Sequence, residues 1–128
     1  MTIEKTSKKV LVVEDERPLS KAIEDKLSNE GYHTIVASSV EDAIEILKNE
    51  EIDIVWLDHY LLGDKIGLDV LVFMKSQEGL KKVPVYVVSN TATEEKVREY
   101  EKMGIRKYFV KANSKLDDIV TDINFVTA

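Results

Sequence analysis

Short apolar runs that end in polar residues recur along the chain, and this pattern is its strongest structural signal. The four clearest are Val10–Val13 before Glu14 and Asp15, Ile54–Leu57 before Asp58, Val85–Val88 before Ser89, and Tyr108–Val110 before Lys111. Such runs are typical of strands buried on both faces of a parallel sheet. His33–Ala37 is a fifth, weaker run. If all five strands are parallel, their carboxyl ends meet at one edge, where ligands bind in open α/β sheets.

Segments with helical spacing separate the predicted strands. The predicted helices begin near Pro18, Ser39, Gly67, Thr93 and Ser114. Ser39 and Thr93 are suitable N-caps, and a proline is well tolerated in the first turn of a helix. The βα unit repeated five times predicts an α/β domain with helices on both faces of a parallel sheet. We therefore expect a flavodoxin-like (βα)5 three-layer sandwich with strand order 2-1-3-4-5.

Length and composition exclude several classes of protein. The 128 residues are enough for one ordinary domain. The formal net charge of −6 argues against direct binding of nucleic acid, and the absence of cysteine excludes disulfides and thiol chemistry. No apolar stretch approaches the roughly 20 residues of a membrane span, and the N-terminus lacks the apolar core of a signal peptide. A cytoplasmic protein without membrane contact is expected.

The polar residues at the strand ends form a chemically coherent group. Glu14, Asp15 and Asp58 would repel one another, and a hard divalent cation with oxygen ligands, such as Mg²⁺, offsets that charge. Lys111 supplies a second positive charge, and Ser89 supplies a hydrogen-bond donor. These are the groups needed to move a phosphoryl group onto an oxygen nucleophile. Asp58 is the candidate nucleophile, because it closes the most apolar strand near the middle of the sheet.

These residues, in this order, resemble the receiver domain of two-component response regulators, including single-domain chemotaxis-type regulators. The matching pieces are Val12-Val13-Glu14-Asp15-Glu16, Asp58 with Leu61 and Gly67-Leu68-Asp69, Ser89, and Tyr108-Phe109-Val110-Lys111. The resemblance extends over essentially the whole chain. It implies a receiver domain over residues 8–126, a flexible tail over residues 1–7 and no output domain.

The resemblance also implies a phosphorylation-dependent signalling switch. Asp58 would accept a phosphoryl group from a sensor histidine kinase or a histidine phosphotransfer protein. Asp15, Asp58 and the backbone carbonyl of Tyr60 would ligate Mg²⁺, with Mn²⁺ as the alternative ion, and Glu14 would act mostly through water. Lys111 would pair with the phosphoryl group. The chain would assist its own phosphorylation and dephosphorylation without being a turnover enzyme on an external substrate.

Two further residues would carry the switch. Ser89 would swing to hydrogen-bond the phosphoryl group, and Tyr108 would turn inward into the vacated space. A homodimer through the fourth helix, fifth strand and fifth helix is common in the family, and the sequence leaves it open for this chain. Neither nucleic acid nor membrane is an expected partner.

The sequence departs from the family pattern near the site. Ala112 follows Lys111 where the family usually has proline in a cis bond, and the sequence leaves the isomer of this bond open. The loop over residues 59–66 lacks the usual proline and is one residue longer than usual. Asn90 follows Ser89 where alanine is typical. Tyr60 and Asn90–Thr91 lie where the family tunes its dephosphorylation rate.

Other functions of the same fold require residues that differ from those in this chain. The main alternative is a pseudo-receiver, a binding module that keeps the fold but is not phosphorylated. A haloacid-dehalogenase-type phosphatase needs a second aspartate two residues after the nucleophile, where this chain has Tyr60. A flavin binder needs a phosphate-cradling loop where Glu14 and Asp15 stand. We expect Trp56 to lie in the core, and His33 and His59 to be surface residues, with His59 pointing away from the crevice.

Overall fold

The computed structural model describes residues 8–61, 63–90 and 93–127. Within these residues the elements are β1 (Lys9–Val13), α1 (Arg17–Asn29), β2 (His33–Ala37), α2 (Val40–Asn49), β3 (Ile54–Leu57), α3 (Gly67–Lys75), β4 (Val85–Ser89), α4 (Glu94–Lys102), β5 (Lys107–Val110) and α5 (Leu116–Thr127). None of these helices is long and apolar enough to cross a membrane. The predicted tail over residues 1–7, and Thr91, lie outside the described residues.

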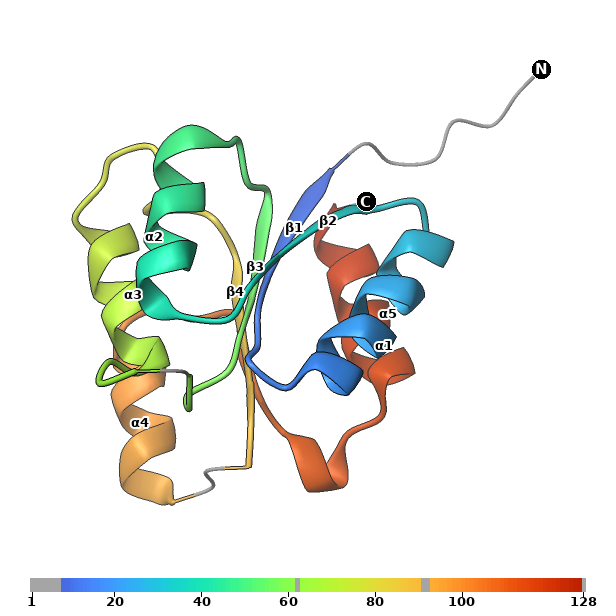
Figure 1. The fold of residues 1–128 in the computed structure, drawn as a ribbon. Helices are drawn as coiled ribbons and strands as arrows, with labels where there is room; N and C mark the ends of the chain where they lie inside the picture. Colours follow the sequence, from blue (N-terminus) through green and yellow to red (C-terminus); the bar gives the residue numbers. More distant parts are fainter. Residues whose placement is uncertain (1–7, 62, 91–92, 128) are drawn as a thin grey trace.

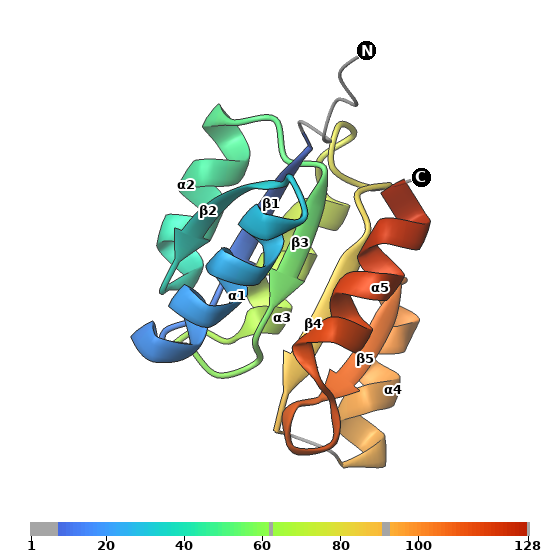
Figure 2. The ribbon, with the colours of Figure 1, turned by 90° about the vertical axis from the view of Figure 1, so that its right-hand side faces the viewer.

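The five strands form one parallel sheet in the order β2-β1-β3-β4-β5, as predicted. Helices α1 and α5 cover one face, and α2, α3 and α4 cover the other (Figures 1 and 2). Val13 is level with Leu57 in the sheet, and the backbone N–H of Asp58 donates to the carbonyl of Val13 at 3.0 Å. This register places Glu14 beside Asp58 at the carboxyl edge.

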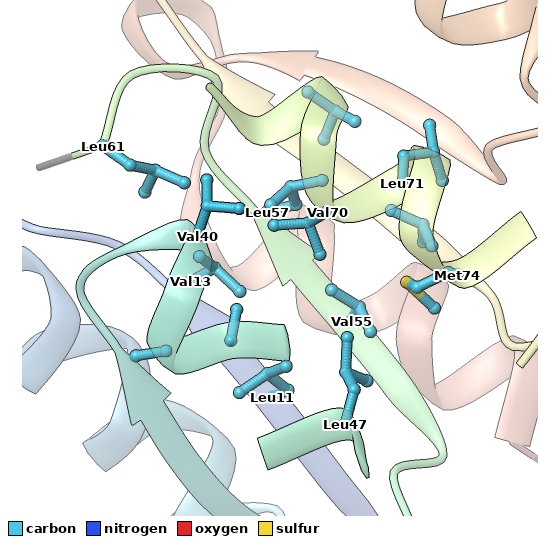
Figure 3. Packing of buried hydrophobic residues seen from close by; sticks show 14 of the residues in the cluster. Leu11, Val13, Val40, Leu47, Val55, Leu57, Leu61, Val70, Leu71 and Met74 are labelled. Carbon is cyan, nitrogen blue, oxygen red and sulfur yellow. The ribbon is translucent and has the colours of Figure 1, made fainter. Parts of the chain in front are cut away.

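The central strands are buried on both faces, which is why they read as continuous apolar runs. Leu11, Val13, Val55 and Leu57 pack into the cluster beneath α2 and α3 (Figure 3). On the opposite face, a second cluster includes Trp56, which is 1% exposed, as predicted. Burying one aliphatic side chain of these clusters, such as that of Leu57, contributes about 1.5–3 kcal/mol. The two cores hold β1 and β3 rigidly, so the residues that follow them are precisely placed in space.

Helix α2 begins with the predicted cap. The Ser39 hydroxyl accepts a hydrogen bond from the backbone N–H of Asp42 at 3.1 Å. We expect Ser39→Ala to lower the free energy of unfolding by about 1 kcal/mol, because it leaves this N–H without its cap. Urea denaturation of both proteins measures the difference. Ser39→Asp keeps an acceptor and should retain most of the stability, so equal losses in the two variants would contradict a capping role.

Candidate functional site

The sheet brings three carboxylates together, and they belong to residues that the sequence singled out. Glu14 and Asp15 follow β1, and Asp58 follows β3. One carboxylate oxygen from each lies within 4.8 Å of the others. Glu14 and Asp58 are buried, whereas Asp15 is half-buried. Three acidic oxygens at this spacing, one of them reachable from solvent, suit a hard divalent cation.

Lys111 completes this cluster from the far end of the sheet. Its Nζ donates to Glu14 Oε1 at 2.8 Å and to Asp58 Oδ2 at 2.9 Å. The residue stands in a single 3-10 turn, Lys111–Asn113, directly after β5. The Lys111–Ala112 bond is trans. The missing proline therefore does not prevent the ammonium from reaching the acidic side chains.

The single positive charge of Lys111 does not offset all the acidic groups of the cluster. Burial raises the pKa of Glu14, although hydrogen bonds from Lys111 and from the Glu16 backbone act to lower it. Burial acts to lower the pKa of Lys111, but its bonds to Glu14 and Asp58 outweigh this and raise it. Lys111 is thus held charged, and this one ammonium is bonded to two members of a cluster of three acidic groups. The donor set fits a divalent cation, which would neutralise the remaining charge.

Ser89 and Tyr108 belong to the neighbouring strands β4 and β5, and their side chains meet. Ser89 ends β4 and is fully buried, whereas Tyr108, on β5, is half-buried. Their side chains share a hydrogen bond, which acts to lower the pKa of Tyr108, although burial raises it overall. The Tyr108 ring also packs on the cluster beneath α2 and α3. A movement of either side chain would therefore affect the other.

The segment after Asp58 forms a closed loop. Tyr60 and Ile66 make an antiparallel bridge, and the backbone N–H of Gly67 donates to the carbonyl of His59 at 2.8 Å. Tyr60, two residues after Asp58, is 61% exposed. A Cβ on Gly67 would lie 2.2 Å from the backbone oxygen of Asp58. Only glycine allows α3 to begin this close to the candidate nucleophile.

His59 corrects the prediction of a surface residue, whereas His33 is exposed as predicted. His59 is 4% exposed, and its Nδ1 lies 2.6 Å from the hydroxyl of Tyr100 on α4. Burial lowers the pKa of His59, and the charge of Lys96 acts in the same direction. Side-chain alternation did not predict this, because β3 ends at Leu57 and the alternation ends with it. The spacing of Tyr100 with Val97 and Met103 indicates an apolar helix face and gives no sign of this contact.

Comparison with known proteins agrees with this geometry. The model of the response regulator receiver domain family matches residues 10–124. The chain belongs to this family. The match supports the receiver interpretation over the phosphatase and flavin-binding alternatives. Receiver domains bind a divalent metal at an acidic pocket, which corresponds here to the cluster of Glu14, Asp15 and Asp58.

One sequence relative and two solved structures are similar to this chain, the structures in their fold. A putative response regulator NtrX-like protein of Rickettsia conorii is 34% identical over 115 residues, which cover 88% of this chain and 24% of the relative. The chain thus spans about a quarter of that relative's length. The Francisella response regulator 1452 receiver domain has a TM-score of 0.83 at 24% identity, covering 93% of this chain and 95% of that one. The Mn²⁺-bound form of response regulator Rcp1 has a TM-score of 0.76 at 24% identity, with 86% and 85% covered.

Proposed function

We propose that this receiver domain is a phosphorylation switch that accepts a phosphoryl group on Asp58. The observation that carries the proposal is the contact of one ammonium, that of Lys111, with both Asp58 and Glu14. A buried nucleophile, a cation that can follow a new anionic group and an acidic pair suited to a divalent ion are thereby brought together. This combination favours phosphoryl transfer over a role as a bare binding surface.

In the proposed reaction a carboxylate oxygen of Asp58 attacks phosphorus. With a phosphohistidine donor the N–P bond breaks, its electron pair returns to the imidazole nitrogen, and an acyl phosphate forms on Asp58. Lys111 already lies 2.9 Å from Oδ2 and can pair with the incoming phosphoryl oxygens. The protein's contribution is positioning and charge neutralisation rather than acid–base chemistry.

A divalent cation is part of this proposal. Asp15, Asp58 and the backbone carbonyl of Tyr60 would hold it, and Glu14 would contribute mostly through water. When bound, the ion would neutralise the charge on the phosphoryl oxygens. Mg²⁺ is the proposed ion and Mn²⁺ the alternative, and the Mn²⁺-bound form of Rcp1 shares the fold. Such an ion would offset the charge of Glu14, and the ammonium of Lys111 could then pair with the phosphoryl group.

Ser89 and Tyr108 are proposed to report the modification. Their hydrogen bond, between the last residue of β4 and the second residue of β5, places a hydroxyl donor next to an aromatic ring near the acceptor edge. A phosphoryl group adds a charge of about −1.5 to −2 and three acceptor oxygens. Ser89 would turn toward these oxygens, and Tyr108 would move into the space it leaves. The two-state pair would convert a local charge into a change of surface.

The proposed donor is a sensor histidine kinase or a histidine phosphotransfer protein acting in the cytoplasm. The chain would not turn over an external substrate, and its net charge of −6 is unsuited to direct contact with nucleic acid. A homodimer through α4, β5 and α5 is a further candidate assembly. The activity of any longer protein that contains this domain is outside the proposal.

Intact mass after incubation with acetyl phosphate tests the proposed function. We expect the parent chain to gain one phosphoryl group with Mg²⁺ and essentially none without it, because the acceptor edge is otherwise too negative to admit the anion. Asp58→Asn removes the nucleophile and should show no gain under either condition. Chelation by EDTA before the donor is added should abolish the gain in the parent.

The same experiment distinguishes the phosphorylation switch from the pseudo-receiver alternative. Ala112 and Asn90, both exposed beside the site, are the features that keep that alternative in view. A parent chain that gains no phosphoryl group while remaining folded by circular dichroism would support the pseudo-receiver. A gain that persists in Asp58→Asn would place the acceptor on another residue.

A further inference from the structure

Helix α4 has fewer buried residues than any other α-helix in the described part of the chain. Among its residues, Glu94–Lys102, only Tyr100 is buried, and it is fully so. Val97 is no more than half-buried. Elements with few buried apolar contacts open at the low end of a protein's stability range. The position of α4 therefore depends strongly on what Tyr100 contacts.

The Tyr100 hydroxyl contacts the phosphoacceptor segment directly. It lies 2.6 Å from Nδ1 of His59, the residue after Asp58. It also interacts with the backbone N–H of Leu68 in the first turn of α3. It lies so close to Gly67 that an added Cβ there would be 3.1 Å away. One buried hydroxyl thus joins α4 to both ends of the loop that follows Asp58.

Ring contacts extend this connection in two directions. The ring centroids of His59 and Tyr60 lie 4.7 Å apart in an edge-to-face arrangement, and those of His59 and Tyr100 lie 5.6 Å apart. The Tyr100 ring lies 5.8 Å from the ring of Tyr108, which shares a hydrogen bond with Ser89. Tyr100 therefore contacts the acceptor loop through His59 and the β4–β5 edge through Tyr108.

We propose that Tyr100 is a positioning residue of the phosphoacceptor site, acting through its hydrogen bond to His59. The bond holds the segment that carries Asp58 against α4, so the occupancy of the acidic pocket sets the position of α4. Because such coupling is reciprocal, loss of the bond also changes the affinity of the pocket. The inference rests on the proposed function and adds a second connection, which runs from the segment after β3 and meets the Ser89–Tyr108 pair at the Tyr100 ring.

The test compares Tyr100→Phe with the parent and with a matched control. Tyr32→Phe also removes the hydroxyl of a buried tyrosine, one that lies before β2 and bonds Asn124 and Thr127 on α5. Amide NMR resonances of α4 are followed during titration with Mg²⁺, and then with beryllofluoride, a phosphoryl mimic, in the presence of Mg²⁺. Intact mass with acetyl phosphate is measured in parallel.

We expect the α4 resonances of the parent and of Tyr32→Phe to shift with both ligands. In Tyr100→Phe these shifts should be largely lost. The apparent beryllofluoride dissociation constant of Tyr100→Phe should differ from that of the parent by roughly 2- to 30-fold, the range of measured coupling effects. A purely structural role would lower stability in both tyrosine variants and leave the shifts and the dissociation constant alike.

Variants at His59 separate the hydrogen bond from packing. His59→Asn places an amide oxygen near the position of Nδ1 and should preserve the α4 response. His59→Leu fills similar volume without any hydrogen-bonding group and should lose the response. In the Tyr100→Phe background the two His59 variants should behave alike, because no hydroxyl is present to bond.

Each result has one meaning. An α4 response that survives in Tyr100→Phe, or that is equal in His59→Asn and His59→Leu, overturns the inference. A parent that is phosphorylated without any α4 response also overturns it and leaves the proposed function standing. If the parent is not phosphorylated, the proposed function fails. In that case, loss of the Mg²⁺ response of α4 in Tyr100→Phe supports the coupling, and retention of that response overturns it.

Discussion

Replacing Lys111 by methionine is expected to slow phosphorylation of Asp58 by acetyl phosphate by about 10²–10³-fold, the usual cost of losing one preorganised group that stabilises transition-state charge. Its Nζ is the cation that the structure places 2.9 Å from Asp58 Oδ2. Methionine keeps most of the side-chain volume, so the loss reports the charge. The initial rate of mass gain at fixed Mg²⁺ measures the effect.

The same substitution should also weaken the fold in the absence of metal. Without Lys111, the buried Glu14 carboxylate loses its 2.8 Å partner, and Asp58 loses the same ammonium. Leaving buried groups without a partner costs about 1–3 kcal/mol of unfolding free energy. Mg²⁺ can supply the missing positive charge, so it should raise the melting temperature of Lys111→Met more than that of the parent.

Lys115→Met is the matched control for net charge. Lys115 is exposed and four residues further along the chain. Its replacement changes the formal charge equally without touching the acidic cluster, so its phosphorylation rate and Mg²⁺ response should match those of the parent. Parent-like phosphorylation of Lys111→Met would show that the ammonium has no part in the reaction.

Gly67→Ala is expected to destabilise the domain by about 3 kcal/mol, the upper part of the usual range for overpacking, and to abolish most of the phosphorylation. The new Cβ would lie 2.2 Å from the backbone oxygen of Asp58, which cannot yield as a side-chain tip would. Gly67 has no positive φ, so the effect is steric and not conformational. Urea denaturation and the rate of mass gain measure the two losses.

Gly79→Ala is the corresponding control. Gly79 also lacks a positive φ, and an added Cβ would meet nothing within 4 Å. Its stability should stay within about 0.5 kcal/mol of the parent, as for surface substitutions in general. If Gly67→Ala matched Gly79→Ala in stability and phosphorylation, the close approach of α3 to Asp58 would not constrain the site.

The sequence determined the architecture because its strands are buried on both faces. Runs such as Val10–Val13 and Ile54–Leu57 have no polar face, and buried strands of that kind pair in parallel beneath covering helices. Parallel pairing brings strand ends together without further information. For this reason the meeting of Glu14, Asp58 and Lys111 could be predicted, although they are up to 97 residues apart in sequence.

Contacts between residues that lie beyond the strand ends could not be predicted from the apolar pattern. No periodic pattern links His59 to Tyr100, which are separated by 41 residues, because a loop has no fixed side-chain direction. His59 was therefore predicted at the surface and lies in the interior. The sequence motif includes Gly67, but its steric role becomes evident only when α3 is seen to start against Asp58.

One physical reason explains which features the sequence determined and which only the tertiary structure decided. The apolar periodicity of the chain determined the fold, the strand order and the edge at which the polar residues gather, because burial of regular elements follows from local pattern. Only the tertiary structure decided which atoms meet there: Lys111 with two carboxylates, Ser89 with Tyr108, and His59 with Tyr100. The distance between donor and acceptor in a hydrogen bond can vary by only a few tenths of an ångström. Packing of the whole domain positions the side chains to that precision.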